Sequence, residues 1–164
     1  MSWSRHAKIA FIGSHGIRKT TAAHGFASVI QRAGRSVEYG REVVRDNPLG
    51  FNESATGEAQ LWVLVSQIRQ ELELAPKADV LVLDRGVMDN FAYYLRAVGG
   101  DDRFDVEPLV RTWSRTYDLV VRLHPFPFAD VEWSQAILPD LGGVPSSHIQ
   151  MADMVSLPID NMLT

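Results

Sequence analysis

The chain contains no cysteine and no long apolar run. The absence of cysteine excludes disulfide bonds and thiolate metal sites, and it favours a cytoplasmic location. No segment approaches the roughly 18 to 20 consecutive apolar residues that a membrane-spanning helix requires. The apolar stretch near the N-terminus is also too short for the core of a signal peptide. We therefore expect a globular protein that works in the cytoplasm without inserting into a membrane.

Positive charge is missing from the last quarter of the sequence. All 16 lysine and arginine residues lie within residues 1–122, whereas residues 123–164 contain five acidic residues and no lysine or arginine. The net charge of −4 argues against a protein that coats nucleic acid. A length of 164 residues predicts a single domain. We expect residues 1–123 to form its core and residues 124–164 to form a lid-like or atypical C-terminal segment.

One stretch near the N-terminus predicts a phosphate site. An apolar run, Ile9 to Ile12, leads into a glycine-containing loop and then into an alanine-rich helical pattern. Strand, glycine loop, Lys-Thr and helix start is the arrangement of a phosphate-binding P-loop, in which backbone N–H groups surround the anion. Lys19 is predicted to contact the outer phosphates and Thr20 to contact Mg²⁺. The predicted cofactor-binding residues are Gly13, Ser14, His15, Gly16, Ile17, Arg18, Lys19, Thr20 and Thr21.

Glycine is absent from one position where this motif has it. The pattern G-x-x-x-x-G-K-[ST] places glycine before the lysine, and this chain has Arg18 there. Two interpretations stay open. Arg18 either adds a charge beside the phosphates, as an arginine supplied in cis does, or it disturbs the tight path of the loop. The alternative for the whole stretch is an ordinary turn between strand and helix with a solvated lysine.

The spacing of apolar residues predicts strands alternating with helices over residues 1–123. We expect strands at 8–12, 36–39, 79–83 and 117–123, and helices at 20–33, 57–75, 87–98 and 104–115. A helical turn is expected to begin within 41–45. This alternation predicts a three-layer α/β/α fold with a mainly parallel sheet. A short helix over 132–138 and a helix or strand over 149–157 are weaker expectations.

The helix expected at 57–75 has a clear apolar stripe. Gln67, Gln70 and Glu71 fall off this stripe and are expected to face away from the core. The stripe consists of Leu61, Leu64, Val65, Ile68 and Leu72.

An acidic residue follows the buried strand expected at 79–83. Asp84 would stand at the carboxyl end of this strand, where ligands of parallel sheets gather and where an acid supports Mg²⁺. Arg85 could then contact a phosphate, and Asp89 lies one turn into the following helix. The alternative for Asp84 and Arg85 is a helix cap with a surface ion pair.

The second expected strand also ends in charged residues. Glu38 is the preferred candidate for the base that orients or deprotonates an acceptor hydroxyl, and Arg41 suits a phosphorylated acceptor. An exposed, ion-paired helical turn formed by Arg41, Glu42 and Arg45 is the alternative. Gln60 could read the acceptor and Trp62 could stack on it, although solvation of Gln60 and core packing of Trp62 are the more ordinary interpretations.

Four segments together resemble a family of small P-loop kinases and related ATPases. The segments are GSHGIRKTT, VEYGREVVRDNP, EAQLWVLVSQIRQELE and LVLDRGVMDNFAYY. The family includes ribosylnicotinamide kinases, deoxynucleoside and thymidylate kinases, and AAA-type ATP/GTP-binding domains. The resemblance covers roughly residues 6–123. It implies the P-loop NTPase fold, binding of ATP or GTP with Mg²⁺, and transfer of a phosphoryl group to a small acceptor.

The resemblance also implies roles for individual residues. The expected metal ligands are Thr20 and Asp84. The expected substrate-binding residues are Glu38, Arg41, Gln60 and Asp89, and the expected catalytic residues are Arg18, Lys19, Glu38, Asp84 and Arg85.

The chain departs from this family in its last segment. The family carries a lid with arginines that clamp the phosphates, and here no basic residue follows Arg122. The first interpretation is a phosphotransferase that acts on a nucleoside, a nucleotide or a similar acceptor. The second is a nucleotide-binding or slowly hydrolysing regulatory protein without acceptor phosphorylation. Neither involves nucleic acid or membrane, and the sequence leaves open whether the chain forms a homodimer.

Overall fold

The computed structural model of the chain describes residues 6–13, 16–50 and 55–123. Within these ranges four strands form one sheet of order β2-β3-β1-β4, and each neighbouring pair is parallel. The strands are β1 (Ala7–Ile12), β2 (Val37–Gly40), β3 (Val80–Asp84) and β4 (Leu119–Arg122). Because all four point the same way, their carboxyl ends lie along one edge of the sheet.

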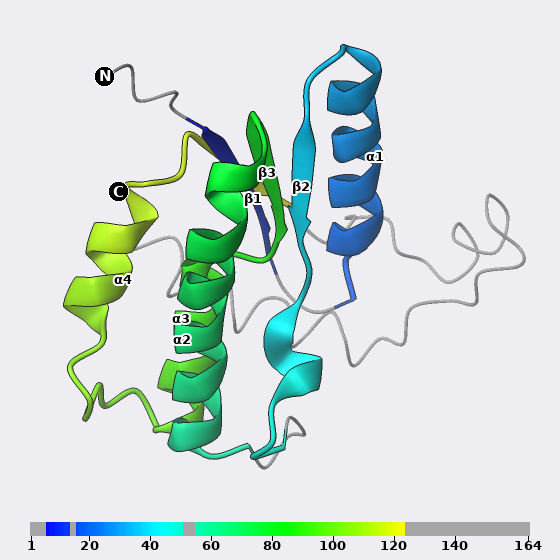
Figure 1. The fold of residues 1–164 in the computed structure, drawn as a ribbon. Helices are drawn as coiled ribbons and strands as arrows, with labels where there is room; N and C mark the ends of the chain where they lie inside the picture. The colour runs from blue at the N-terminus through cyan, green and yellow to red at the C-terminus, as the bar shows by residue number, and fades with distance from the viewer. Residues whose placement is uncertain (1–5, 14–15, 51–54, 124–164) are drawn as a thin grey trace, which may run out of the picture.

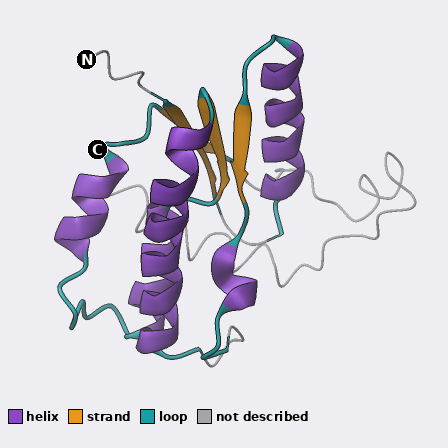
Figure 2. Cartoon of the chain, viewed as in Figure 1, coloured by secondary structure: helices purple, strands orange, loops and turns teal. Residues whose placement is uncertain are grey.

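Helices cover both faces of the sheet (Figures 1 and 2). One face carries α1 (Lys19–Arg32), and the other carries α2 (Gly57–Leu74) and α3 (Val87–Ala97). The last described helix, α4 (Glu107–Ser114), packs against α3. The predicted three-layer α/β/α fold is confirmed.

Alternation along β1 divides the core into two clusters. Ile9 and Phe11 pack toward α1, whereas Ala10 and Ile12 pack toward α2 and α3. Successive side chains of a strand point to opposite faces, so a central strand covered on both sides must be apolar at every position. The same reason accounts for β3, in which all five residues are buried.

The buried face of α2 is shifted by one residue from the predicted apolar stripe. Val65 and Leu72 are 51% and 62% exposed, although the apolar stripe placed them in the core. Gln67 and Glu71 are only 1% and 0% exposed, so the expectation that they face away from the core is wrong. Both polar side chains form hydrogen bonds with neighbouring elements, and these bonds offset the free-energy cost of burying polar groups.

The other predicted elements agree with the structure to within three residues at their ends. The turn expected at 41–45 is a short 3₁₀ helix, η1 (Val43–Asp46), and a second one, η2 (Ala75–Lys77), follows α2. Thr56 begins α2 by accepting a hydrogen bond from the Ala59 N–H. The elements expected after residue 123 lie outside the described residues. Within the described ranges, no helix is long and apolar enough to cross a bilayer.

Candidate active site

The carboxyl ends of β1 and β3 bring together the two segments that the sequence singled out. The predicted phosphate loop follows β1, and Asp84 ends β3 in register beside Phe11. The chain leaving β2 arrives at the same edge, where it carries Glu42. The site is therefore built from three strand ends, as expected for a ligand site of a parallel sheet.

The described part of the phosphate loop requires glycine where it begins. Gly13 has a φ of +136°, and a Cβ there would approach the Leu123 carbonyl oxygen to 2.6 Å and Ile17 Cδ1 to 2.5 Å. Only a residue without a side chain fits this position. Of the predicted loop residues, Ser14 and His15 lie outside the described residues.

Arg18 follows the backbone path that suits the glycine of the motif. Its φ of 64° and ψ of 34° lie in the left-handed region, and its carbonyl accepts the first hydrogen bond of α1, from the Ala22 N–H at 3.1 Å. The side chain is exposed. A left-handed conformation costs a non-glycine residue roughly 1–2 kcal/mol. The loop therefore keeps its course at the expense of strain at Arg18.

Lys19 begins α1 and is buried. Burial lowers the pKa of its ammonium group to about 8, and repulsion from the Arg85 guanidinium contributes to the same shift. The carboxylates of Asp89 and Asp84 partly oppose it. An anion bound beside this lysine would stabilise the ammonium form, because its negative charge compensates for the hydration lost on burial.

Thr20 and Asp84 meet as the motif predicts. The Thr20 hydroxyl donates a hydrogen bond of 2.6 Å to Asp84 Oδ2. The buried hydroxyl of Tyr39 lies beside Asp84 but makes no regular hydrogen bond among the described residues. Burial and the negative charge of Asp84 raise the pKa of this hydroxyl. Hydroxyl and carboxylate oxygens are hard ligands of the kind that Mg²⁺ prefers.

Arg85 forms a buried ion pair that the sequence analysis did not identify. Its Nε lies 2.6 Å from Glu42 Oε1, and its guanidinium carbon lies 5.1 Å from the centre of the Tyr93 ring. Glu38, the preferred base candidate, lies inside β2 and alternates with Tyr39, which packs toward α1. By strand alternation its side chain faces the α2 side of the sheet, whereas Glu42 lies beyond the strand end.

Asp89 contacts the phosphate loop from behind. It is fully buried, and its Oδ1 accepts a hydrogen bond of 3.0 Å from the Gly13 N–H. Burial raises the pKa of the carboxyl to about 6, against the opposing effect of Arg85 and Lys19. This contact ties α3 to the start of the loop. The expectation that Asp89 binds the acceptor stays a prediction.

The remaining predicted residues lie at the margin of this site. Arg41 is exposed and pairs with Asp46 at 2.5 Å, which matches the ion-paired turn that was its alternative interpretation. Gln60 and Trp62 are half-buried near the start of α2. Thr21 is exposed on the first turn of α1.

Several buried polar atoms on β2 and α3 lack hydrogen-bond partners among the described residues. An orphaned buried polar group costs roughly 1–3 kcal/mol, so a group of them calls for an explanation. A polar ligand beside these elements would supply one. The atoms are Tyr39 Oη, Asp89 Oδ2, Asn90 Nδ2 and Tyr93 Oη.

Comparisons with known proteins identify the family and support the fold. The sequence pattern of a family described as an AAA domain matches residues 8–137. No curated protein matches the chain.

Two solved structures of deoxyadenosine kinase from M. mycoides share the fold. The structure with the products dCMP and dCDP has a TM-score of 0.54 at 16% identity, with 94% of this chain and 82% of that chain covered. The structure with bound dATP has a TM-score of 0.51 at 17% identity, with 96% and 81% covered. At this identity the likeness establishes a P-loop kinase-like fold.

Proposed function

This chain belongs to the AAA domain family, and on that premise we propose that it binds a nucleoside triphosphate at residues 13–21 and transfers a phosphoryl group to a small acceptor. The observation that carries the proposal is the 2.6 Å hydrogen bond between Thr20 and Asp84. It joins a hydroxyl at the start of the helix after the phosphate loop to a carboxylate at a neighbouring strand end. An ordinary strand-to-helix turn has no need of that pairing.

ATP or GTP, with Mg²⁺, is the proposed cofactor. Thr20 and Asp84 would hold the ion, and Lys19 would contact the outer phosphates. Within the described residues no three His, Cys, Asp or Glu side chains form a metal cluster. This suits Mg²⁺, which usually takes one or two protein ligands and completes its shell with phosphate and water. When bound, the ion would neutralise charge that develops on the phosphates.

We assign the base to Glu42 in preference to Glu38. Glu42 lies beyond the end of β2 and pairs with Arg85, and its negative charge acts on Lys19. A carboxylate placed between a cation and an acceptor can take the proton of the acceptor hydroxyl as that oxygen forms its bond to phosphorus. Arg85 would then stabilise the negative charge on the phosphoryl oxygens. Arg41 and Gln60 would contact the acceptor.

The acceptor is proposed to be a nucleoside, a nucleotide or a similar small molecule. The support is the likeness of fold to structures of a deoxyadenosine kinase. At the identity found, this likeness supports the class of acceptor and leaves its identity to experiment.

A second function is a nucleotide-binding or slowly hydrolysing regulatory module. The strained backbone of Arg18 and the absence of basic residues after Arg122 favour it. Such a protein would bind nucleotide and consume it at a rate independent of any acceptor.

The test combines nucleotide titration with an acceptor panel. ATP and GTP, each with Mg²⁺, are titrated into the wild-type protein and Lys19→Ala by calorimetry. We expect at least tenfold weaker binding by Lys19→Ala, because a charge-assisted hydrogen bond is worth about 1.5–3 kcal/mol. Nucleosides and nucleoside monophosphates are then assayed for acceptor-dependent ATP consumption. No binding at millimolar nucleotide would exclude both functions, and consumption that ignores every acceptor would favour the second.

Glu42→Gln and Glu38→Gln form the matched pair for the base. Glu42→Gln should lower acceptor-dependent turnover by roughly 10²- to 10⁴-fold, the usual contribution of a general base. Glu38→Gln should leave it nearly unchanged. A reversed result would return the role to Glu38.

A further inference from the structure

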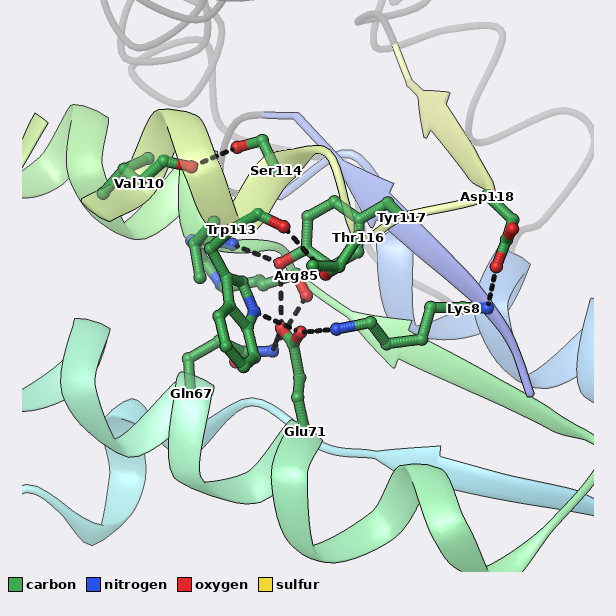
Figure 3. Close-up of polar contacts among 11 residues, drawn as sticks. Lys8, Gln67, Glu71, Arg85, Val110, Trp113, Ser114, Thr116, Tyr117 and Asp118 are labelled. Atoms are coloured by element: carbon green, nitrogen blue, oxygen red, sulfur yellow. Dashed lines mark hydrogen bonds and ion pairs between the residues drawn. The ribbon is translucent and has the colours of Figure 1, made fainter. Parts of the chain in front are cut away.

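Glu71, in the last turns of α2, is a buried carboxylate surrounded by four donors (Figure 3). Its Oε1 accepts hydrogen bonds from Gln67 Nε2 at 3.0 Å and from the Tyr117 hydroxyl at 2.8 Å. Its Oε2 accepts from Lys8 Nζ at 2.9 Å and from Trp113 Nε1 at 2.7 Å. Two donors on each oxygen fill the hydrogen-bonding capacity of the carboxylate. These five residues are called the Glu71 cluster below.

The positive member of the cluster is enclosed by aromatic rings. Lys8 Nζ lies 4.6 Å from the centre of the Trp113 ring and 5.2 Å from that of the Tyr117 ring. The ion pair with Glu71 and the two rings together compensate for removing the ammonium group from water. The cluster therefore connects β1, α2, the end of α4 and the segment before β4.

Two members of the cluster also contact the turn that follows β3. Gln67 Nε2 donates a second hydrogen bond, of 3.2 Å, to the Arg85 carbonyl. The Tyr117 hydroxyl accepts one of 2.9 Å from the Val87 N–H. Between these points lies Gly86, where a Cβ would come within 3.3 Å of Tyr117 Cε2. The cluster thus forms hydrogen bonds with the backbone on both sides of Gly86.

The turn held in this way contains a strained residue. Arg85 has a φ of 116°, a conformation that side chains rarely adopt. Such strain costs roughly 1–3 kcal/mol and persists only where the surroundings over-determine the backbone. The Arg85 side chain in this conformation pairs with Glu42, which lies beyond the end of β2.

The charge of Glu71 fixes the direction of the hydrogen bonds. A carboxylate only accepts, so the single hydroxyl hydrogen of Tyr117 must point to Glu71. The oxygen of Tyr117 is then left as an acceptor for the Val87 N–H. In the same way Gln67 must direct its amide donors to Glu71 and to the Arg85 carbonyl. A neutral side chain at position 71 that both donates and accepts, such as that of glutamine, would not enforce these directions.

We propose that the Glu71 cluster is a positioning device for the Arg85 turn. Glu71 touches no substrate in this scheme. It orients Gln67 and Tyr117, which hold residues 85–87 so that Arg85 stays paired with Glu42. The consequence for catalysis rests on the proposed phosphoryl transfer. The consequence for the backbone of the turn does not, and the experiment measures both.

The experiment compares two variants that each remove one donor to Glu71. Tyr117→Phe removes the hydroxyl that reaches the turn, and Trp113→Phe removes an N–H that does not. Both keep an aromatic ring. In Tyr117→Phe we expect amide exchange at Val87 to be about tenfold faster, the factor for one ordinary hydrogen bond. We expect kcat to fall up to about 100-fold, as for a misplaced catalytic group, with the Kd for nucleotide within about twofold.

Trp113→Phe should leave Val87 exchange and kcat within about threefold of the wild-type protein. Its loss of stability should be similar to that of Tyr117→Phe, because each variant removes one donor to Glu71. Equal effects of the two variants on exchange would overturn the proposal, because they would show general loosening of the core. Gln67→Met removes the other contact with the turn and serves if Tyr117→Phe does not fold. It should lower kcat in the same way. If the wild-type protein transfers no phosphoryl group, the exchange data still decide the proposal, and only the proposed function fails.

Discussion

Glu71 and Asp89 are both fully buried carboxylates on helices that cover the same face of the sheet, yet their surroundings differ. Glu71 accepts hydrogen bonds from four side chains and forms an ion pair with Lys8. Asp89 accepts one from the Gly13 N–H, and its other oxygen has no hydrogen-bond partner among the described residues. One carboxylate is saturated, and the other retains free capacity.

The difference separates scaffold from binding site. The four hydrogen bonds to Glu71 favour one arrangement of the elements that they join, because movement would leave the buried carboxylate unpaired. An unsatisfied carboxylate beside Lys19 and Arg85 sits where the balance of charge changes when an anion arrives. We therefore expect variants in the Glu71 cluster to act mainly on stability and on the Arg85 turn. Variants around Asp89 should respond to pH and to ligand.

The largest expected effect comes from breaking the charge pair of the saturated site. Lys8→Met removes the ammonium group and leaves Glu71 buried without its counter-charge. Breaking a buried pair in this way costs about 3–5 kcal/mol. Urea denaturation should show that loss in the free energy of unfolding. Adding Glu71→Gln to Lys8→Met should recover much of it, because the uncompensated charge is then gone. A loss below about 1 kcal/mol would mean that the two sites do not differ in this respect.

Asp89 should give the next largest effect, and it should depend on pH. Burial gives its carboxyl a pKa of about 6 in the folded protein, against an ordinary value of 3.8 for aspartate. Between these values the folded state holds a proton that the unfolded state has released. Stability contributed by this group is therefore lost as the pH rises from about 4 to 6. The loss is up to about 3 kcal/mol at about 1.4 kcal/mol per unit.

Asp89→Asn isolates this contribution, since an amide oxygen can still accept from the Gly13 N–H. The difference in unfolding free energy between Asp89→Asn and the wild-type protein should grow as the pH rises through this window. Hydrogen bonds lower the pKa values of Glu58 and Asp79, so these groups also make stability depend on pH. Their contributions are the same in both proteins and cancel in the difference. A difference that is flat with pH would show that Asp89 has an ordinary pKa and would remove the contrast with Glu71.

Much of this fold could be predicted from the sequence, because it depends on local patterns. Continuous apolar runs gave the buried strands, and helical spacing gave the helices. The meeting of Thr20 and Asp84 followed from a motif placed on a parallel sheet. Local signals were sufficient to place a residue wherever its position follows from the strand or helix that carries it.

The orientation of α2 could not be predicted in this way. Its apolar stripe and its buried face differ by one position, and burial of Glu71 depends on Lys8 and Trp113, which lie 63 and 42 residues away. No local pattern specifies such partners. Glu38 as the base stays a prediction. Its position inside β2 commits its side chain to one face of the sheet, whereas Glu42 lies beyond the strand end, and residue type alone did not distinguish the two. The positive φ of Arg85 left no trace in the residue types, whereas that of Arg18 falls where the motif has glycine.

Arg18 offers the smallest and most selective test, because its strain differs in origin from that of Arg85. No cluster like that of Glu71 grips Arg18 among the described residues, and its side chain is exposed beside the phosphate loop. Arg18→Gly should raise the free energy of unfolding by about 1 kcal/mol, since glycine adopts the left-handed region freely. Arg18→Ala loses the same charge and keeps the strain, so it should show no such gain.

The two variants also separate charge from backbone in nucleotide binding. If the Arg18 guanidinium assists the phosphates, both should bind ATP more weakly by a similar factor of roughly two to five, the range for an exposed pair. Arg18→Lys should retain most of the wild-type affinity. We expect this result, because no basic residue of the last segment can take the place of Arg18. Higher turnover in Arg18→Gly alone would show instead that the strain itself limits transfer. The strained backbone of Arg18 would then oppose catalysis, in contrast to that of Arg85, which the Glu71 cluster holds in place.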